Sequence, residues 1–178
     1  MAHDKQKEYC LKIKNMFPNF FKNRDVLDVG ALDINGSNRF LFENCNYLGI
    51  DIAAGKNVDL ICKVHEFNPN RQYDTIISTE CFEHDMFYHL SLARIVDLLT
   101  PGGLFIFTCA TTGRVEHGTR RSDPSSAPLL YGEWADYYKN LTEKDITDVL
   151  DIPSIFKDFK FEAPTDVFDL YFYGIKGS

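Results

Sequence analysis

Short runs of apolar and β-branched residues recur along most of this chain and alternate with more amphipathic segments. The runs cover residues 25–30, 46–51, 58–62, 73–78 and 104–108. Each is bounded by glycine, proline or polar residues, as is typical of strands buried in a parallel sheet. We therefore predict a strand at each of these places.

The intervening segments have helical spacing. Apolar side chains at Leu11, Ile13, Met16, Phe17 and Phe20 predict an amphipathic helix over residues 7–21, ending near Pro18. We expect this N-terminal segment, residues 1–22, to pack beside the sheet or to form a lid over the site. A short helix over 38–43, capped by Ser37, and a largely apolar helix over 89–99 follow. The sequence Pro101-Gly102-Gly103 should stop the latter before the next strand.

The last third of the chain differs from the rest. Residues 110–138 are polar and rich in glycine, proline and serine, and they show no periodicity. A loop of this length in a compact domain is usually functional or disordered, and we assign it to the substrate side. Thr142 and Asp145 resemble a capping box that opens a helix to about Leu150. Residues 156–162 and 166–176 should then close the sheet as an antiparallel pair.

Alternating strands and helices define the expected fold. Parallel neighbouring strands need crossover connections, which helices supply on both faces of the sheet. We predict an α/β protein, a three-layer Rossmann-like sandwich whose seven-stranded sheet is mostly parallel and ends in a C-terminal antiparallel hairpin. No repeat or composition boundary divides residues 1–178, so a single domain is expected. Ligands of such sheets bind at the carboxyl ends of the strands.

Composition narrows the function. The 178 residues are 44% apolar, enough for a hydrophobic core, yet no run reaches the roughly 18 apolar residues of a membrane span. The start of the chain lacks the order of a secretory signal, so we expect a cytoplasmic protein without membrane contact. A net charge of −7 disfavours nucleic acid as a partner. The five cysteines are widely spaced, and neither they nor the histidines have metal-site spacing, so we predict reduced thiols and no metal.

Two residues point to an adenosine ligand. Gly30 ends the first predicted strand, where the lack of a Cβ lets the backbone approach a ligand closely. Asp51 ends the second strand, about twenty residues further on, where Rossmann-type sites bind the ribose hydroxyls. Together they predict a nucleoside site at this edge of the sheet.

The turn after Gly30 discriminates between adenosine cofactors. A dinucleotide site requires the pattern G-x-G-x-x-G, but Leu32 occupies the position of the second glycine. Asp33 would repel a diphosphate, whereas Asp33 and Asp28 tolerate the positive charges of S-adenosylmethionine. An NAD-dependent oxidoreductase is therefore disfavoured.

Four stretches in order resemble a known family. They are Val26-Leu27-Asp28-Val29-Gly30, Tyr47-Leu48-Gly49-Ile50-Asp51-Ile52, the segment from Tyr73 to His84, and Leu98-Leu99-Thr100-Pro101-Gly102-Gly103-Leu104. Over roughly residues 24–150 the chain resembles a class I S-adenosylmethionine-dependent methyltransferase, of the broad group often labelled methyltransferase type 11.

The resemblance implies S-adenosylmethionine as cofactor and S-adenosylhomocysteine as product. It places the methionyl end on Asp28, Gly30 and the turn that follows, the ribose on Asp51 and the adenine on Ile52. The full expected set of cofactor-binding residues is Asp28, Gly30, Ala31, Leu32, Asn35, Gly36, Asp51, Ile52, Val64, His65 and Thr79.

Two departures from the family pattern affect this set. Lys63 stands where the family usually has the acid near the adenine amino group, which leaves the Val64 backbone and His65 as substitutes. Asn35-Gly36 would replace the missing Gly-x-Gly through a longer turn.

The acceptor side has weaker signals. His84 and His117 are candidate catalytic bases, because histidine exchanges a proton near physiological pH. For His84 a capping or packing role is an equal alternative. For His117 a place in a mobile surface loop is the favoured alternative. Arg114 and Tyr138 are candidate substrate-binding residues, since arginine pairs with anions and aromatic side chains line small-molecule sites. Trp134 is a further candidate for the wall of the acceptor pocket.

The sequence therefore predicts methyl transfer to an oxygen or nitrogen of a small or medium-sized acceptor, by in-line displacement that depends mainly on proximity and orientation. It does not identify the acceptor or the oligomeric state. The alternative is a non-catalytic adenosyl-binding or interaction module whose cofactor turn has degenerated, as Leu32 and Lys63 suggest.

Overall fold

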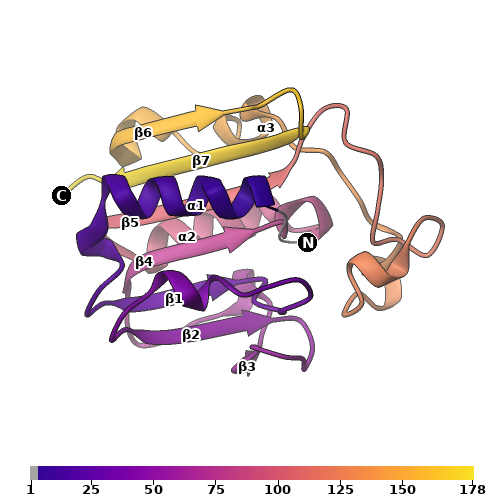
Figure 1. The fold of residues 1–178 in the computed structure, drawn as a ribbon, viewed down its shortest axis with the longest axis horizontal. Helices are drawn as coiled ribbons and strands as arrows, with labels where there is room; N and C mark the ends of the chain where they lie inside the picture. Colours follow the sequence, from indigo (N-terminus) through magenta and orange to yellow (C-terminus); the bar gives the residue numbers. More distant parts are fainter. Residues whose placement is uncertain (1–3) are drawn as a thin grey trace.

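The computed structural model describes residues 4–178 and contains one seven-stranded sheet (Figure 1). The strands are β1 (Asp25–Val29), β2 (Asn46–Asp51), β3 (Leu60–Ile61), β4 (Tyr73–Thr79), β5 (Leu99–Ala110), β6 (Phe156–Glu162) and β7 (Asp169–Lys176). Their order is β3-β2-β1-β4-β5-β7-β6, and all pairs are parallel except those that β7 makes with β5 and β6. The predicted mostly parallel sheet with a C-terminal antiparallel hairpin is confirmed.

Helices cover both faces of the sheet. Helix α1 (Asp4–Met16) lies on one face, where its buried Tyr9, Cys10 and Ile13 pack with Ile77, Ile106 and Tyr171 of the strands. Helix α2 (Tyr88–Leu98) buries Leu92, Ile95 and Leu98 against the other face. The helix therefore packs beside the strands, which is one of the two expected arrangements. Of the predicted apolar stripe only Ile13 is buried within α1, whereas Leu11 and Met16 are exposed.

Short helical turns complete the chain. The 3₁₀ helices are Pro18–Phe20, Asn38–Leu41, Val64–Glu66, Phe82–His84, Pro124–Ser126 and Gly132–Asp136, and the short α-helices are α3 (Glu143–Thr147) and α4 (Ile152–Ile155). Ser37 caps the second of these turns by accepting a hydrogen bond from the Arg39 N–H at 3.1 Å. Both bonds of the capping box between Thr142 and Asp145 are present, as predicted.

Several boundaries differ from the sequence prediction. The segment predicted as a helix over 38–43 is a 3₁₀ turn, the third strand has only two residues, and the helix expected to reach Leu150 ends at Thr147. Strand β5 begins at Leu99 and runs through the Pro101-Gly102-Gly103 segment, because Leu99 already pairs with Tyr73 and a bulge absorbs the residues before Leu104. Cross-strand pairing decides the limits of β3 and β5, and a local pattern does not contain this pairing.

The segment between β5 and α3 extends beyond the edge of the sheet toward which the β2 and β4 arrowheads point (Figure 1). Although it has no strand or α-helix, its Thr119, Ser126 and Ala135 are buried. The predicted loop is therefore packed onto the rest of the protein. Within the described residues, no helix is both long and apolar enough to cross a bilayer.

Candidate active site

A cavity opens at the carboxyl edge of the parallel strands. Its floor consists of the ends of β1, β2 and β4 and the turns that follow them, including Gly30, Asp51 and Thr79. Ser126, Ala127, Leu129, Leu130 and Trp134 of the long loop form the opposite wall. The loop predicted to lie on the substrate side thus closes over the edge where α/β sheets bind ligands.

Gly30 shapes the floor of this cavity. Its φ of +76° lies in the left-handed region, and a Cβ at this position would lie 2.5 Å from Cys81 Sγ. The N–H groups of Gly30 and Ala31 both donate to the Ile50 carbonyl, at 3.0 and 3.1 Å. Conformation and close approach both require glycine here.

Asp51 is held rigidly at the end of β2. Its two carboxylate oxygens accept hydrogen bonds from the backbone N–H groups of Leu32, at 3.1 Å, and Ile52, at 2.8 Å. Burial raises the pKa of this carboxyl, and these two bonds oppose the shift. Each oxygen retains a lone pair for a further donor, so the carboxylate is positioned to accept hydrogen bonds from a diol in the cavity.

Asp28 is a buried acid with unused bonding capacity. The residue is 2% exposed and lines the cavity, and Tyr47 donates its hydroxyl proton to Oδ2. Oδ1 is buried and forms no hydrogen bond of normal geometry with a described residue, since the Asn38 amide that faces this carboxyl donates to Thr79 at 3.0 Å. Burial raises the pKa of Asp28 to about 6. Because a buried unpaired carboxylate oxygen is costly, its position suits a ligand that brings donors and positive charge.

The other end of the cavity is more apolar and aromatic. Val64 and His65 line it on the 3₁₀ turn after β3, and the His65 ring packs on Phe87 with 4.8 Å between centroids. His65 Nδ1 is buried without a partner among the described residues. The Lys63 ammonium lies 6.0 Å from the centre of the Trp134 ring, in cation–π contact. The lysine therefore contacts the loop wall, and His65 and the nearby Asp85 are polar groups that line this part.

Most residues predicted for the cofactor come together at this cavity. Those that line it are Asp28, Gly30, Ala31, Leu32, Gly36, Asp51, Ile52, Val64, His65 and Thr79, and His84 from the acceptor set lines it as well. Asn35 is exposed and does not line the cavity. Asp33 also lies outside, because it forms an ion pair with Lys56 at 2.9 Å and accepts a hydrogen bond from Gly36 N–H. The expectation that Asp33 faces the ligand charge is not supported.

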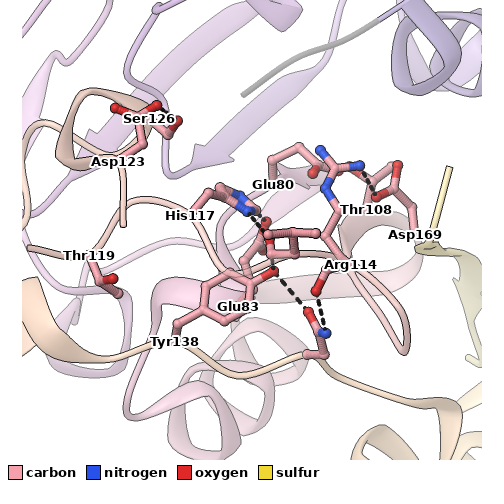
Figure 2. Close-up of polar contacts among 12 residues, drawn as sticks. Glu80, Glu83, Thr108, Arg114, His117, Thr119, Asp123, Ser126, Tyr138 and Asp169 are labelled. Atoms are coloured by element: carbon pink, nitrogen blue, oxygen red, sulfur yellow. Dashed lines mark hydrogen bonds and ion pairs between the residues drawn. The ribbon is translucent and has the colours of Figure 1, made fainter. Parts of the chain in front are cut away.

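Beside the cavity, Glu83, His84, His117 and Tyr138 form a compact polar cluster. The three aromatic rings meet edge to face, with centroids 5.1 Å apart for the two histidines and 5.6 and 5.0 Å from Tyr138 to His84 and His117. His117 Nε2 lies 4.0 Å from Glu83 Oε1 (Figure 2). Tyr138 donates its hydroxyl proton to Asn140 at 2.8 Å. The loop and the turn after β4 thus meet at this cluster.

Burial shifts the pKa values in this cluster toward the neutral forms. Desolvation lowers the pKa of His84 to about 3 and also lowers the pKa of His117. It raises the pKa of Glu83, and the negative charge of Glu80 adds to this shift. The histidine nitrogens are therefore available as lone-pair donors at neutral pH.

Arg114 does not face the cavity. Its guanidinium binds the Val167 carbonyl at 2.8 Å and the buried Asp169 carboxylate at 3.3 Å (Figure 2). The other two loop arginines pair within the loop, Arg120 with Asp136 and Arg121 with Glu116. All three side chains order the loop, so the structure does not support Arg114 as an anion-binding residue.

Sequence reasoning missed Glu83 and the apolar wall formed by Leu129 and Leu130. Leu129 and Leu130 lie in a polar stretch without periodicity, so no local signal marked them. Glu83 stands directly before His84, and its place between predicted elements was the available signal. Only the fold shows that its carboxylate is fully buried.

Together, a Rossmann-like sheet, a glycine turn after β1 and an acid at the end of β2 define an adenosyl- or nucleotide-binding class of protein. Residues 1–145 match the family model described as a methyltransferase domain, so the chain belongs to this family. The match confirms the resemblance found in the sequence. No curated protein is similar enough in sequence to count as a relative.

Solved structures show the same fold at low sequence identity. The N-methyltransferase NodS from Bradyrhizobium japonicum is 14% identical, with a TM-score of 0.62 over 97% of each chain. Burkholderia thailandensis 1,6-didemethyltoxoflavin-N1-methyltransferase is 17% identical, with a TM-score of 0.60 over 100% of this chain and 92% of that one. Haemonchus contortus phosphoethanolamine N-methyltransferase 2 is 15% identical, with a TM-score of 0.67 over 96% of this chain and 53% of that one.

Proposed function

We propose that this protein binds S-adenosylmethionine in the cavity and transfers its methyl group to an oxygen or nitrogen of a small or medium-sized acceptor. The observation that carries the proposal is the buried Oδ1 of Asp28, which lines the cavity without a partner among the described residues. A cationic ammonium donor is the kind of group that satisfies it. The NodS and toxoflavin enzymes have also been solved with S-adenosylhomocysteine, which supports the same cofactor here.

The described residues fit the three parts of this cofactor. Asp28 and the backbone at Gly30 and Ala31 would hold the methionyl end. Asp51 would accept hydrogen bonds from the ribose hydroxyls, since each carboxylate oxygen keeps a free lone pair. Ile52, Val64 and His65 would enclose the adenine, with His65 Nδ1 as its polar contact in place of the family's acid. We leave Asn35 and Arg114 out of this assignment.

When bound, S-adenosylmethionine supplies an electrophilic methyl group on a sulfonium. The protein's contribution is to fix the acceptor in line with that methyl and to exclude water. Leu129, Leu130 and Trp134 of the loop wall cover the cavity and would exclude water from it. Glu83, His84, His117 and Tyr138 lie on the acceptor side, where a ring nitrogen can take the acceptor's proton. Two of the similar enzymes are named for small molecules of the proposed size, 1,6-didemethyltoxoflavin and phosphoethanolamine.

Direct binding tests this proposal against its alternatives. We expect calorimetric titration to show saturable 1:1 binding of S-adenosylmethionine and S-adenosylhomocysteine, and no binding of NAD. Binding of the adenosyl ligands without turnover in an acceptor screen would favour the non-catalytic module. If a folded sample binds neither ligand, the proposal is wrong.

Cofactor affinity should depend on pH through Asp28. The groups that face this carboxyl are Tyr47, Arg39, Asp51, Asn38 and the buried Cys10 thiol. Its pKa in the free protein is raised to about 6, so below this value the carboxyl is protonated and loses its attraction for a cation. We expect affinity to be constant above about pH 7 and to fall by up to about tenfold per pH unit below 6.

The same shift affects folding with the opposite sign. Because the folded protein holds the Asp28 proton more tightly than the unfolded chain does, the contribution of Asp28 to stability decreases as pH rises from 3.8 to about 6.

Calorimetric titration with S-adenosylmethionine from pH 5 to 8 tests the predicted pH dependence of cofactor affinity. Asp28→Asn is the control, which should bind weakly and lose the pH dependence. An affinity profile of the unmodified protein that stays flat across this range would contradict the assignment.

A further inference from the structure

The cluster beside the cavity contains polar atoms that nothing in the described part of the chain satisfies. Both carboxylate oxygens of Glu83, both ring nitrogens of His84 and Nε2 of His117 are buried and make no hydrogen bond there. Glu83 is 0% and His84 7% exposed. Leaving one such group unpaired costs about 1–3 kcal/mol, so five together in one place require an explanation.

The three side chains also converge. One ligand atom from each of Glu83, His84 and His117 lies within 4.8 Å of the other two. Around a zinc ion, ligand atoms at about 2.0–2.2 Å from the metal stand roughly 3.3 Å apart. Ligand atoms that lie up to 4.8 Å apart would have to approach one another by up to about 1.5 Å, which side-chain rotations supply.

His117 has the geometry of a prepared metal ligand. Its Nδ1 lies 3.0 Å from the Val115 carbonyl, which only accepts, so Nδ1 carries the proton and Nε2 presents a lone pair. This arrangement, in which the second ring nitrogen donates to a backbone carbonyl, is the usual support of metal-bound histidine. Tyr138 packs against both histidine rings and keeps them in place.

The surroundings favour a cation. The carboxyl groups of Glu80 and Asp169 lie near Glu83. Arg114 is bound to Asp169, so its charge is already engaged (Figure 2). A divalent ion placed among these groups would offset the negative charge of the acids and give all three converging ligands a partner.

We propose that Glu83, His84 and His117 bind one divalent transition-metal ion, of which zinc is the representative, at the acceptor side of the cavity. Two imidazoles and one carboxylate are the ligand set of catalytic zinc sites that keep an open position. His84 lines the cavity, so that position faces it. The sequence analysis predicted no metal because only the spacing of possible ligands along the chain was considered. These three ligands come instead from the turn after β4 and from the distant loop.

The metal site does not depend on the proposed function. Only the use of the open position, to hold an oxygen of the methyl acceptor, rests on methyl transfer taking place here. A metal-bound nitrogen has no lone pair left for a proton, so metal binding excludes His84 and His117 as general bases. Metal analysis therefore also decides how the acceptor is activated.

The test uses the full chain, freed of metal by a chelator and then titrated with Zn²⁺ and with Co²⁺. We expect one ion per protein and a Co²⁺ spectrum without thiolate charge transfer. Glu83→Gln and His117→Ala should each weaken binding at least about tenfold, while His89→Ala and His65→Ala, which alter an exposed histidine and a cavity histidine outside the cluster, should not.

Absence of stoichiometric binding by the unmodified chain would overturn the proposal, and so would binding that survives both cluster substitutions. A thiolate band in the Co²⁺ spectrum would move the ion to one of the cysteines and would overturn it as well. S-adenosylmethionine binding is measured separately with chelator present. A chain that binds metal but no cofactor refutes the proposed function alone, and the reverse result refutes the metal site alone.

Discussion

Replacing Asp51 by alanine is expected to weaken S-adenosylmethionine binding about 100-fold. The carboxylate would accept hydrogen bonds from two ribose hydroxyls, and each bond to a charged acceptor contributes about 1.5–3 kcal/mol. It also fixes the Leu32 and Ile52 backbone through hydrogen bonds of 3.1 and 2.8 Å, so alanine loosens the cavity floor too. Asp51→Asn keeps one acceptor oxygen and should lose about tenfold. Isothermal calorimetry measures each affinity.

Asp33→Asn is the matched control for this experiment. Asp33 lies in the turn after Gly30, yet it pairs with Lys56 outside the cavity, and asparagine still accepts the Gly36 N–H bond. We expect its cofactor affinity to equal that of the unmodified protein. If the Asp51 variants, checked for folding by thermal denaturation, bind as tightly as the control does, Asp51 is not the ribose ligand.

Gly30→Ala should strongly destabilise the folded protein, although it adds only one methyl group. The substitution forces alanine into a φ of +76° and places its Cβ 2.5 Å from Cys81 Sγ and 2.7 Å from Cys81 Cβ. Left-handed backbone costs about 1–2 kcal/mol and overpacking about 1–3 kcal/mol. At roughly 2–4 °C per kcal/mol, a loss of about 3 kcal/mol lowers the Tm by roughly 6–12 °C.

Gly102→Ala separates these two causes. Gly102 has nearly the same φ, +75°, and a Cβ there would meet nothing within 4 Å. This variant should show the backbone cost alone, a loss of about 1–2 kcal/mol in the free energy of unfolding. Adding Cys81→Gly to Gly30→Ala should recover the steric part. Equal Tm values for the two alanine variants would show that close approach to Cys81 is not what requires glycine at position 30.

Much of the fold could be predicted because its signals are local. Alternating apolar runs and helical spacings in the first hundred residues identify strands and helices, and their order implies a parallel sheet. The predicted strand boundaries were wrong where pairing with a neighbouring strand sets the end of the strand. Leu99 joins β5 because Tyr73 lies opposite, and β3 is limited to Leu60–Ile61, where it pairs with the end of β2.

The cofactor side of the site was likewise within reach of the sequence. Gly30 and Asp51 each end a strand, and parallel strands bring their carboxyl ends to one edge, so their proximity follows from strand order. The acceptor side offered no such rule. His117 and Tyr138 lie in a loop without periodicity, and their contacts with His84 depend on how that loop folds back.

By itself, the sequence determined the sheet, its edge and the pair of residues that mark an adenosyl site, because hydrophobic periodicity and strand-end chemistry are encoded within short segments. Only the tertiary structure decided which polar groups lose water. Asp28 and Glu83 are both acids near strand ends in the sequence. Burial leaves one carboxylate oxygen of Asp28 and both of Glu83 unpaired among the described residues. Arg114, which looked free for an anion, is instead bound to Asp169. Desolvation and long-range pairing depend on the whole packed chain, and they separate residues that a local pattern treats alike.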